Sequence, residues 1–538
     1  MNRRTIGWML VAVQALMLVV LLILPLRPCT PPWLVVGGLL FIGGVAIGIL
    51  ALRQLGPALT PTPVPKPAAD LQTEGIYHWA RHPIYSSVMV LTLGLVVAAG
   101  SAWSLCWWVL LVCFFAIKSR WEDTLLAEGH GQAWLDWAEK TGPFFPHLPR
   151  AITRGLLITL TVIVWSSSFW TGFTFQQTYA ESDGEPKEVI IATWMRDNNM
   201  GPVVAQLENL YYTYINTPQI GGQPTVSADL TAEDSAGVEP MQPVPSASAQ
   251  ATVAPEVKHL DPPPPIISPV SMPEPKEGLW QPVGSHVAGI PAIYVTRVRA
   301  DDVHTSYFAS AMWIDTTLAT AMFIPGYQEP GGPNPFDGAL PKEDWPIVLA
   351  NFNGAFRLAD TMAGYYYGGE MVKPLVNGKA STVIYKDGSI KIGKWGHGLQ
   401  MSDQVQSVRQ NLNLIVDKGE SKVSSATDNV VWGATTDKES LAWRSAIGQR
   451  SDGSIVYVGS PYLSAAGLAN TLVGAGVQEA MVLDMNNWWT AGFYFRHRKD
   501  GSPLCRKLEP SIAESCDRFL LPYKRDSYQF LANQPVSP

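Results

Sequence analysis

Residues 81–85 of this 538-residue chain form an Arg-His-Pro-x-Tyr cluster that combines side-chain types able to do chemistry. The cluster follows Gly75 and Tyr77, and it lies where a cytoplasmic loop would re-enter the membrane between hydrophobic runs. Polar groups at the edge of a membrane are costly to desolvate and are seldom incidental. The cluster therefore predicts chemistry embedded in a membrane.

The elements that would position this cluster are apolar runs long enough to cross a bilayer. Five runs are expected to be transmembrane helices: 6–26, 33–52, 84–100, 103–117 and 155–173. The first is expected to stay uncleaved, because no small-residue cleavage site follows it. The second contains five glycines that allow close contact between helices: Gly37, Gly38, Gly43, Gly44 and Gly48.

Basic residues set the expected orientation. All but one of the Lys and Arg residues before position 174 would share one side, and Arg27 lies in a short loop opposite. The positive-inside rule makes the crowded side cytoplasmic. Five crossings then place everything after Phe173 outside the cytoplasm. We expect an integral protein of the bacterial inner (cytoplasmic) membrane with its C-terminal domain outside.

Residues 75–146 resemble the superfamily of isoprenylcysteine carboxyl methyltransferases and phospholipid methyltransferases. The family pattern is Gly-x-Tyr-x-x-x-Arg-His-Pro-x-Tyr, a helical hairpin, an acidic residue, and aromatic residues before a proline. The matching residues are Gly75, Tyr77, Arg81, His82, Pro83, Tyr85, Glu122, Gly131, Trp134, Trp137 and Pro146. The chain departs from the pattern at Ser86 and Ser87, which replace a small glycine, and at the two tryptophans, where tyrosine is common.

The resemblance implies S-adenosylmethionine as the cofactor and methyl transfer to a membrane lipid or prenylated acceptor. The cofactor carries a carboxylate, an ammonium and a sulfonium, which need a cation, an anion and aromatic faces. Arg81 and His82 would then hold the carboxylate, and Glu122 would hold the amine or orient the acceptor. Tyr85, Trp134 and Trp137 would line the pocket. Alternatively, Arg81 and Glu122 are interfacial charges, the tryptophans form an aromatic belt, and the unit is an anchor without cofactor.

Beyond the fifth run the composition changes twice. Residues 176–216 form a connector with apolar residues at helical spacing, which packs on the outer domain or lies along the membrane surface. Residues 217–278 are rich in Pro, Ala and Ser and are expected to be a linker of polyproline character. Such a linker would tether the outer domain without fixing it.

Residues 279–531 show short β-type runs separated by turns, of which Asp387-Gly388 marks a hairpin. One helix is expected at 465–475. This pattern predicts a soluble α+β domain with a mixed sheet. The expected fold class is therefore multi-domain, with an all-α polytopic membrane domain of about five transmembrane helices at 1–175.

The outer domain resembles the phosphodiester glycosidase family, which is related to the enzyme that uncovers mannose 6-phosphate. The resemblance rests on four motifs in family order, which are Asn353-Gly354-Ala355-Phe356, Val376-Asn377-Gly378, Arg444-Ser-Ala-Ile-Gly448 and Leu483-Asp484-Met485-Asn486-Asn487-Trp488. Met485, Asn486 and Asn487 replace glycines of the family's last motif. Their side chains restrict the close backbone approach to a ligand that glycine permits.

Cleavage of a sugar-phosphate bond needs a cation for the phosphate and carboxyl groups for proton transfer or water activation. The resemblance implies Arg444 as the phosphate ligand, Asp484 as acid/base or metal ligand, and Asn353 as a ligand of a sugar hydroxyl or the phosphate. Further substrate contacts are expected from Gly354, Phe356 and Trp488. Alternatively, Arg444 and Asp484 form a supporting ion pair, and the domain is a non-catalytic glycan-binding module.

The net charge and the cysteines give further information about the partners and the compartment of the protein. The net charge of −7 and the lack of a basic run argue against a nucleic-acid partner. Cys505 and Cys516 lie at a loop-closing separation and are expected to pair in an oxidising compartment. The sequence contains no zinc motif, and a divalent metal at the outer domain stays open.

Together these patterns predict a membrane-bound protein of two parts. A methyltransferase-like unit acts on a lipid or prenyl-type acceptor with S-adenosylmethionine. An outer hydrolase domain acts on sugar-phosphate diesters of glycans or glycolipids.

Overall fold

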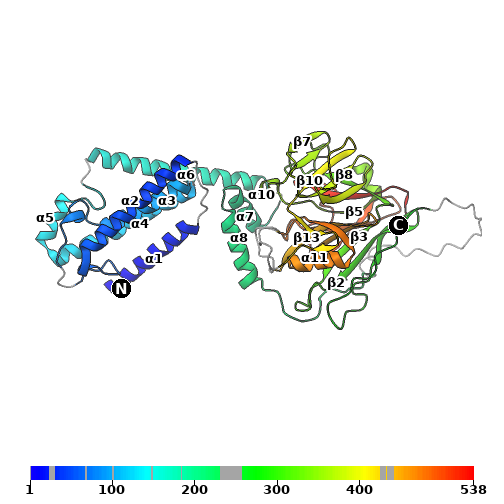
Figure 1. The fold of residues 1–538 in the computed structure, drawn as a ribbon, viewed down its shortest axis with the longest axis horizontal. Helices are drawn as coiled ribbons and strands as arrows, with labels where there is room; N and C mark the ends of the chain where they lie inside the picture. Colours follow the sequence, from blue (N-terminus) through cyan, green and yellow to red (C-terminus); the bar gives the residue numbers. More distant parts are fainter. Residues whose placement is uncertain are drawn as a thin grey trace, which may run out of the picture. The chain divides into compact units, whose positions relative to one another are not determined.

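The computed structural model describes residues 2–23, 31–66, 70–99, 102–146, 150–182, 184–230, 257–424, 432 and 441–537. The chain divides into two compact units, Met1–Val204 and Ala205–Pro538. Figure 1 shows that the first unit is built from helices and the second mainly from sheets.

Unit 1 contains long helices joined by short helical turns. Its elements are α1 (Arg3–Ile23), α2 (Pro31–Leu55), η1 (Gly56–Ala58), η2 (Gly75–His78), α3 (Pro83–Ala99), α4 (Ala102–His130), α5 (Gln132–Lys140), α6 (Arg150–Ala180) and α7 (Lys187–Asp197). Helix α8 (Gly201–Leu210) crosses the boundary and continues as a π-helical turn, η3 (Tyr211–Ile215). Helices α2 and α3 begin with prolines, which suit the first helical turn because no partner is needed there for the missing N–H.

Three helices in the described part of the chain are long and apolar enough to cross a membrane: Arg3–Leu22, Leu34–Ala58 and Ser104–His130. The sequence predicted five spans, so this count is corrected. Helix α3 is apolar, but its 17 residues rise only about 25 Å, short of about 30 Å of hydrocarbon. The run 155–173 lies in α6, where many side chains fall outside the described residues.

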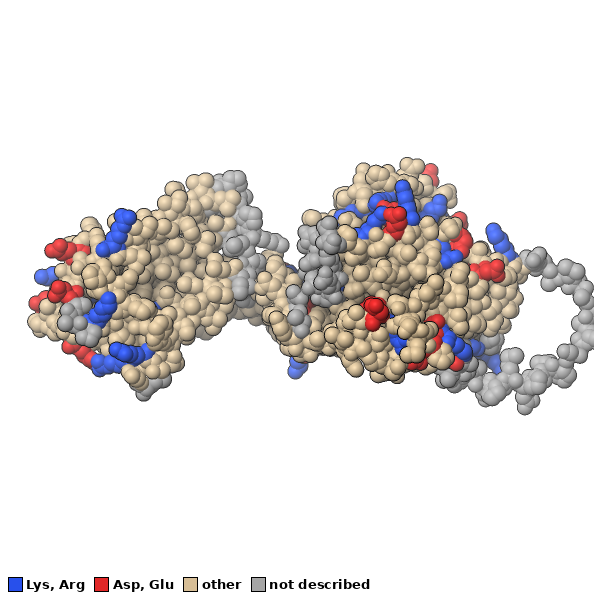
Figure 2. Space-filling model, turned by 60° about the horizontal axis from the view of Figure 1, so that its bottom comes forward, with Lys and Arg blue, Asp and Glu red and all other residues tan. Residues whose placement is uncertain are grey.

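Many charged side chains of unit 1 gather at one end, at the left in Figure 2, and the surface next to this end is largely uncharged. The helices expose large apolar side chains along their length, such as Leu16 at 63%, Leu39 at 66% and Ile42 at 65%. Exposed apolar helix faces of this extent are stable in lipid. This distribution fits a unit embedded in a bilayer.

Helices α2 and α3 pack through glycines. A Cβ added to Gly44 would lie 2.5 Å from the backbone nitrogen of Leu91, and one added to Gly37 would lie 2.6 Å from the carbonyl oxygen of Gly94. Of the five glycines in α2, the structure places three against α3 and leaves two in open space: Gly37, Gly44 and Gly48 in contact, Gly38 and Gly43 open.

Unit 2 contains three sheets, and the largest has nine strands. Its strand order is β12 (Glu420–Ser421), β11 (Leu414–Asp417), β15 (Val477–Val482), β13 (Ala442–Arg450), β14 (Ile455–Leu463), β3 (Ala309–Ile314), β2 (Ile290–Val298), β1 (Gln281–Val287) and β19 (Val536–Ser537). Helix α11 (Ala465–Gly474) covers it, and Leu468 and Leu472 are fully buried. The helix begins where Ser464 Oγ accepts a hydrogen bond from Gly467 N at 2.9 Å.

Two five-stranded sheets complete unit 2. One has the order β7 (Glu370–Lys373), β6 (Tyr365–Tyr367), β10 (Val405–Gln410), β8 (Ala380–Tyr385), β9 (Ile390–Lys394). The other has the order β17 (Pro503–Lys507), β16 (Gly492–His497), β5 (Val348–Asn353), β18 (Ser527–Ala532), β4 (Ala319–Ile324). Short helices lie at η4 (Lys342–Ile347) and α10 (Leu358–Thr361).

Every pair among these described strands is antiparallel, where the sequence predicted a mixed sheet. Short turns explain the difference, because a hairpin forces antiparallel neighbours. Strands β8 and β9 are joined at Gly388, whose φ of +80° favours glycine. The core lies between the sheets, and it includes Phe352, Tyr457 and Tyr528.

Described parts of the expected linker 217–278 pack on unit 2. Leu230 is 1% exposed and Ile266 is 6% exposed, and both belong to core clusters. Leu260 N donates to Asp315 Oδ2 at 2.7 Å. The composition of the segment did not predict these contacts, because a few apolar residues are enough to hold a proline-rich segment on the surface of a folded domain. Residues 231–256 lie outside the described residues.

The cysteines that the sequence paired form a disulfide. Cys505 in β17 and Cys516 are joined, with their Cα atoms 5.8 Å apart. Cys106 and Cys113 are free, and Cys29 lies outside the described residues.

The contact between α2 and α3 gives a test in which two neighbouring glycines are compared. We expect Gly44→Ala to destabilise the chain by about 1–3 kcal/mol, because the new methyl group overlaps the α3 backbone. Gly43→Ala should be neutral or mildly stabilising, because it meets open space and removes helix-interior glycine entropy. Thermal unfolding of both variants in the same detergent measures this, and equal midpoints would contradict the packing.

Candidate functional site

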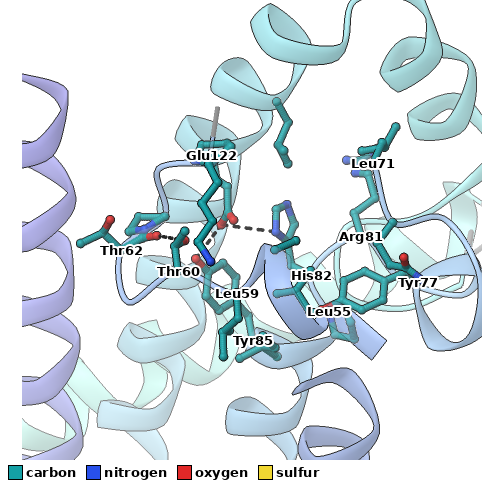
Figure 3. A pocket seen from close by; sticks show the side chains of 18 of the residues that line it. Leu55, Leu59, Thr60, Thr62, Leu71, Tyr77, Arg81, His82, Tyr85 and Glu122 are labelled. Atoms are coloured by element: carbon teal, nitrogen blue, oxygen red, sulfur yellow. Dashed lines mark hydrogen bonds and ion pairs between the residues drawn. The ribbon is translucent and has the colours of Figure 1, made fainter. Parts of the chain in front are cut away.

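Unit 1 encloses a cavity of about 270 Å³ at the charged end of its helices. The described lining comes from α1, the end of α2, the segment after it, residues 77–85, α4 and α5, and Figure 3 shows labelled side chains of this lining converging. The polar and aromatic lining residues are Gln14, Thr60, Thr62, Lys66, Asp70, Gln72, Tyr77, Arg81, His82, Tyr85, Lys118, Glu122, His130 and Trp137. The volume is close to the lower end, about 300 Å³, of typical ligand pockets.

The segment that carries the cluster is fixed at its start by a glycine. Gly75 has φ +61°, and a Cβ there would collide with the side-chain amide of Gln54. Ile76 N donates to Gln54 Oε1 at 2.7 Å, and Tyr77 donates its hydroxyl to Ala51 O at 3.3 Å. These bonds hold residues 75–78 against the end of α2, which aims the following cluster at the cavity.

Arg81 is held mainly by backbone groups. Its guanidinium donates to the carbonyl oxygens of Ala138 at 2.8 Å and Thr141 at 3.1 Å, and it pairs with Asp123 at 3.2 Å. It also lies 5.6 Å from the centre of the Trp134 ring. Arg81 Nε is buried without a hydrogen-bond partner among the described residues.

His82 lies between two carboxylates of α4. Its Nε2 is 2.8 Å from Asp123 Oδ1, and its Nδ1 is 3.5 Å from Glu122 Oε2. Burial lowers the pKa of His82, but the hydrogen bonds to Asp123 and Glu122, with their charges, outweigh it and raise the pKa to about 9. His82 is therefore an imidazolium at neutral pH.

Glu122 links the imidazolium to Tyr85, and Lys118 lies against the ring of Tyr85. The Tyr85 hydroxyl donates to Glu122 Oε2 at 2.6 Å (Figure 3), and the Tyr85 ring stacks on His82 with ring centres 5.4 Å apart. Lys118 Nζ lies 4.9 Å from the centre of the Tyr85 ring and donates to Gln14 of α1. The cavity thus offers an anion, cations and aromatic faces within one small volume.

The four residues that the sequence assigned to a cofactor, Arg81, His82, Tyr85 and Glu122, all line this cavity. The sequence analysis missed Asp123 and Lys118. A usable signal existed, because Lys118 precedes Glu122 by one helical turn on α4 and therefore shares its face. No sequence pattern pointed to Gln14, since the family pattern begins at Gly75, far from α1 in the sequence.

In unit 2, Asn353 and Asp484 meet around Ser445. Asn353 Nδ2 donates to Ser445 Oγ at 3.1 Å, and Asn353 Oδ1 accepts from the Tyr457 hydroxyl at 2.8 Å and from Ala491 N at 3.1 Å. Ser445 Oγ donates in turn to the Asp484 carbonyl oxygen at 2.9 Å. All of these groups are buried, and Asn353, the last residue of β5, is thereby linked to β13, to β14 and to the residue before β16.

The Asp484 side chain pairs with Arg525. Its Oδ2 is 3.0 Å from the Arg525 guanidinium, and its Oδ1 accepts from Met485 N at 2.7 Å. Arg444 is adjacent to Ser445 in β13 and therefore points to the opposite face of that strand. Its Nε donates to Leu463 O at 2.8 Å. Arg525, which the sequence analysis missed, is thus the cation on Asp484.

Two of the residues expected to contact substrate, Gly354 and Phe356, lie next to Asp526 and Arg409. Gly354 N donates to Asp526 O at 2.8 Å, and a Cβ on Gly354 would collide with the Asp526 carboxylate. The Phe356 carbonyl accepts from Arg409, which pairs with Asp526 at 2.7 Å in full burial. Gly354 and Phe356 therefore contact the buried ion pair between Arg409 and Asp526.

Cations gather around Trp489. Arg525 lies 4.7 Å, Lys524 5.3 Å and Arg518 5.8 Å from its ring. Arg518 also lies 4.4 Å from the Tyr523 ring and 6.0 Å from the Trp488 ring. Its three guanidinium nitrogens lack a hydrogen-bond partner among the described residues.

Burial accordingly lowers the pKa of the Arg518 guanidinium. Arg518 forms an ion pair with Glu514 at 3.4 Å. A desolvated guanidinium is normally held by close oxygen partners. The described residues contain no group of three or more His, Cys, Asp or Glu placed to hold a metal ion.

One family model matches part of unit 1. Residues 32–133 match the phospholipid methyltransferase family. The match contains α2, α3, α4 and the cluster at 81–85. With the three apolar helices, it shows an integral membrane protein with a methyltransferase-like unit. No curated protein matches the chain.

The C-terminal part is similar to solved structures at low identity. One is the zebrafish N-acetylglucosamine-1-phosphodiester α-N-acetylglucosaminidase catalytic domain, auto-inhibited by its pro-peptide, with 15% identity and a TM-score of 0.31 over 47% of this chain and 88% of that chain. Another is a hypothetical protein from Synechocystis, with 10% identity and a TM-score of 0.28 over 46% and 63%. Similarity at these TM-scores carries no weight for activity.

The raised pKa of His82 predicts a pH dependence. A proton binds more tightly to folded His82, with a pKa of about 9, than to an unfolded histidine at 6.5. The resulting stability is complete below pH 6.5 and is lost as the pH rises to about 9. We expect the free energy of unfolding to fall by up to about 3 kcal/mol over this window.

Thermal unfolding across this pH range in detergent measures the effect. His82→Gln should flatten the dependence, while His78→Gln, which alters an exposed histidine of the same segment, should keep it. A wild-type profile unchanged by His82→Gln would show that His82 is neutral in the folded chain.

Proposed function

We propose that unit 1 transfers a methyl group from S-adenosylmethionine to a lipid or prenyl-type acceptor. The observation that carries the proposal is the cavity in which Glu122, Lys118, His82 and Tyr85 converge. The family match supports it, because the cavity lining from the end of α2 to His130 lies within the matched residues.

The cavity lining fits this cofactor by its chemistry. Glu122 suits an ammonium or ribose hydroxyls, and Lys118 suits a carboxylate. The rings of Tyr77, Tyr85 and Trp137 suit a sulfonium and a purine. Arg81 Nε is a buried donor without a partner among the described residues, which an acceptor atom of a bound molecule would satisfy. When bound, the cofactor supplies an electrophilic methyl group.

The chain's own residues orient and enclose the reactants. Tyr85 and His82 both hydrogen-bond to or contact Glu122, so the carboxylate is fixed in one orientation before a ligand arrives. Arg81 is tied to the backbone of residues 138–141, which fastens α5 over the cavity. Together these contacts position the reactants and exclude water, which is the main contribution that a transferase needs.

The acceptor is proposed to be amphipathic, because the lining has an apolar side. This side consists of Val11, Leu52, Leu55, Leu59, Leu71 and Leu126. A charged or polar head would face Glu122 and Lys118, and an acyl or prenyl chain would follow the apolar side. The charged end of unit 1 is proposed to face the cytoplasm of a bacterium, where S-adenosylmethionine is made, and unit 2 is proposed to lie outside.

Unit 2 supports a second candidate function, the hydrolysis of sugar-phosphate diesters. The favouring observation is the group of cations around Trp489 beside Asp484. Guanidinium groups bind phosphate, an indole stacks on a sugar, and a carboxylate transfers protons. Because Arg444 lies on the other face of β13, phosphate binding is assigned to Arg518 and Arg525. A glycan-binding module without turnover is the alternative.

For unit 1 we expect Glu122→Gln to weaken S-adenosylmethionine binding about 10- to 100-fold, because it replaces a charge-assisted hydrogen bond with a neutral one. Binding of radiolabelled cofactor to the full chain in lipid nanodiscs measures this, with methyl transfer to nanodisc lipid as the second readout.

The matched control is Glu128→Gln on the same helix, whose exposed carboxylate pairs with Arg3. It should bind like wild type. Absence of binding by the wild-type chain would contradict the proposal and favour an anchor without cofactor.

For unit 2 we expect hydrolysis of a chromogenic sugar phosphodiester by the full chain to fall at least about 100-fold in both Asp484→Asn and Arg518→Gln. Arg498→Gln, at an exposed arginine, is the control. Thermal unfolding checks that each variant is folded. No turnover by wild type, with retained glycan binding, would instead identify a binding module.

A further inference from the structure

The start of unit 2 presents a row of exposed apolar side chains, here called the apolar stripe. Its members are Leu207 at 54% exposure, Leu210 at 53%, Tyr211 at 46%, Tyr214 at 77% and Ile215 at 76%. Their spacing is i, i+3, i+4, i+7 and i+8, which places them on one face of α8 and η3. A contiguous apolar face of this kind marks an interaction site.

The side of η3 that carries Tyr212, and the residues that follow η3, lie against unit 2. Burial raises the pKa of Tyr212 to about 12, and its neighbours include Tyr462 and Arg444. Gln219 N donates to the Tyr307 hydroxyl at 3.2 Å, and Gly221 N donates to Val303 O at 2.7 Å. The segment is therefore fixed on the domain, and the stripe is its outward face rather than core left unpacked.

Charge and residue type distinguish a lipid surface from a protein partner. Residues 201–220 contain a single charged side chain, Glu208, whereas protein interfaces usually have a polar and charged rim. Tyrosines beside leucine and isoleucine are typical of the membrane interface, where a ring inserts and its hydroxyl stays hydrated. The stripe has this composition.

Chain connectivity makes a bilayer the partner that is always present. Unit 1 is embedded in a membrane and ends at Val204, directly before the stripe. A tethered site meets its target at a high effective concentration, so even a weak apolar surface stays bound. A second copy or another protein would have no such advantage.

We propose that the apolar stripe is a lipid attachment site that holds unit 2 on the bilayer surface, with Tyr211 and Tyr214 in the headgroup region. This goes beyond either proposed activity and does not depend on them. The stripe would keep unit 2 within reach of headgroup-linked molecules and restrict the orientations that the domain adopts.

The test uses the full chain in nanodiscs of phosphatidylethanolamine and phosphatidylglycerol. Cys29, Cys106 and Cys113 are replaced by serine, and the disulfide is left intact. Single cysteines introduced by Leu207→Cys, Tyr211→Cys or Tyr214→Cys are spin-labelled. The matched control is Ile267→Cys, which labels a 91% exposed apolar residue of unit 2 outside the stripe.

Accessibility of each label to oxygen, which partitions into lipid, is compared with accessibility to a water-soluble nickel chelate. We expect the oxygen-to-nickel ratio to be several-fold higher at the stripe than at residue 267. Equal ratios would overturn the proposal by placing the stripe in water. Low accessibility to both reagents would also overturn it, because it would place the stripe against protein.

Discussion

The cost of placing charge in an apolar unit governs the arrangement of the site. Four ionisable groups, Arg81, His82, Glu122 and Asp123, lie together at one end of helices that otherwise expose aliphatic surface. Each is tolerable there because another neutralises it. The pairing also brings the loop 75–82, α4 and the end of α5 into one place, so the same contacts that satisfy the charges form the cavity wall.

Unit 2 meets the same constraint less completely. Asp526 and Arg409 neutralise each other in full burial, and Asp484 neutralises Arg525. Arg518 departs from this pattern, since aromatic rings surround it and the Glu514 carboxylate lies 3.4 Å from its guanidinium. Aromatic faces compensate a guanidinium only in part. The charge of Arg518 is therefore balanced by the Glu514 ion pair together with the rings beside it.

Sequence patterns predicted local features better than they predicted which distant residues contact one another. The spacing of 81–85 with Glu122 placed four cavity residues together, because the helical hairpin between them fixes their separation. Asp484 illustrates the limit, since its partner, Arg525, lies on a different strand connection and no pattern relates the two. Along β13, a period of two places Arg444 and Ser445 on opposite faces, and it is Ser445 that contacts Asn353 and Asp484. Three further features could not be predicted from local patterns, because each depends on contacts between distant parts of the chain. They are the number of membrane spans, the antiparallel direction of the strands, and the packing of part of the linker on unit 2.

The glycine contact between α2 and α3 affects how a molecule can enter the cavity. With Gly44 against the Leu91 backbone and Gly37 against Gly94, the two helices have no side-chain layer through which they can slide. They form one rigid wall, so a molecule of lipid size enters by displacement of some other boundary. Helix α1 contributes Val11 and Gln14 to the lining, and it is held on α4 by the Lys118–Gln14 and Trp107–Met17 hydrogen bonds. The contact between α2 and α3 therefore fixes one side of the cavity, and any opening of lipid size has to come from the contacts of the other elements.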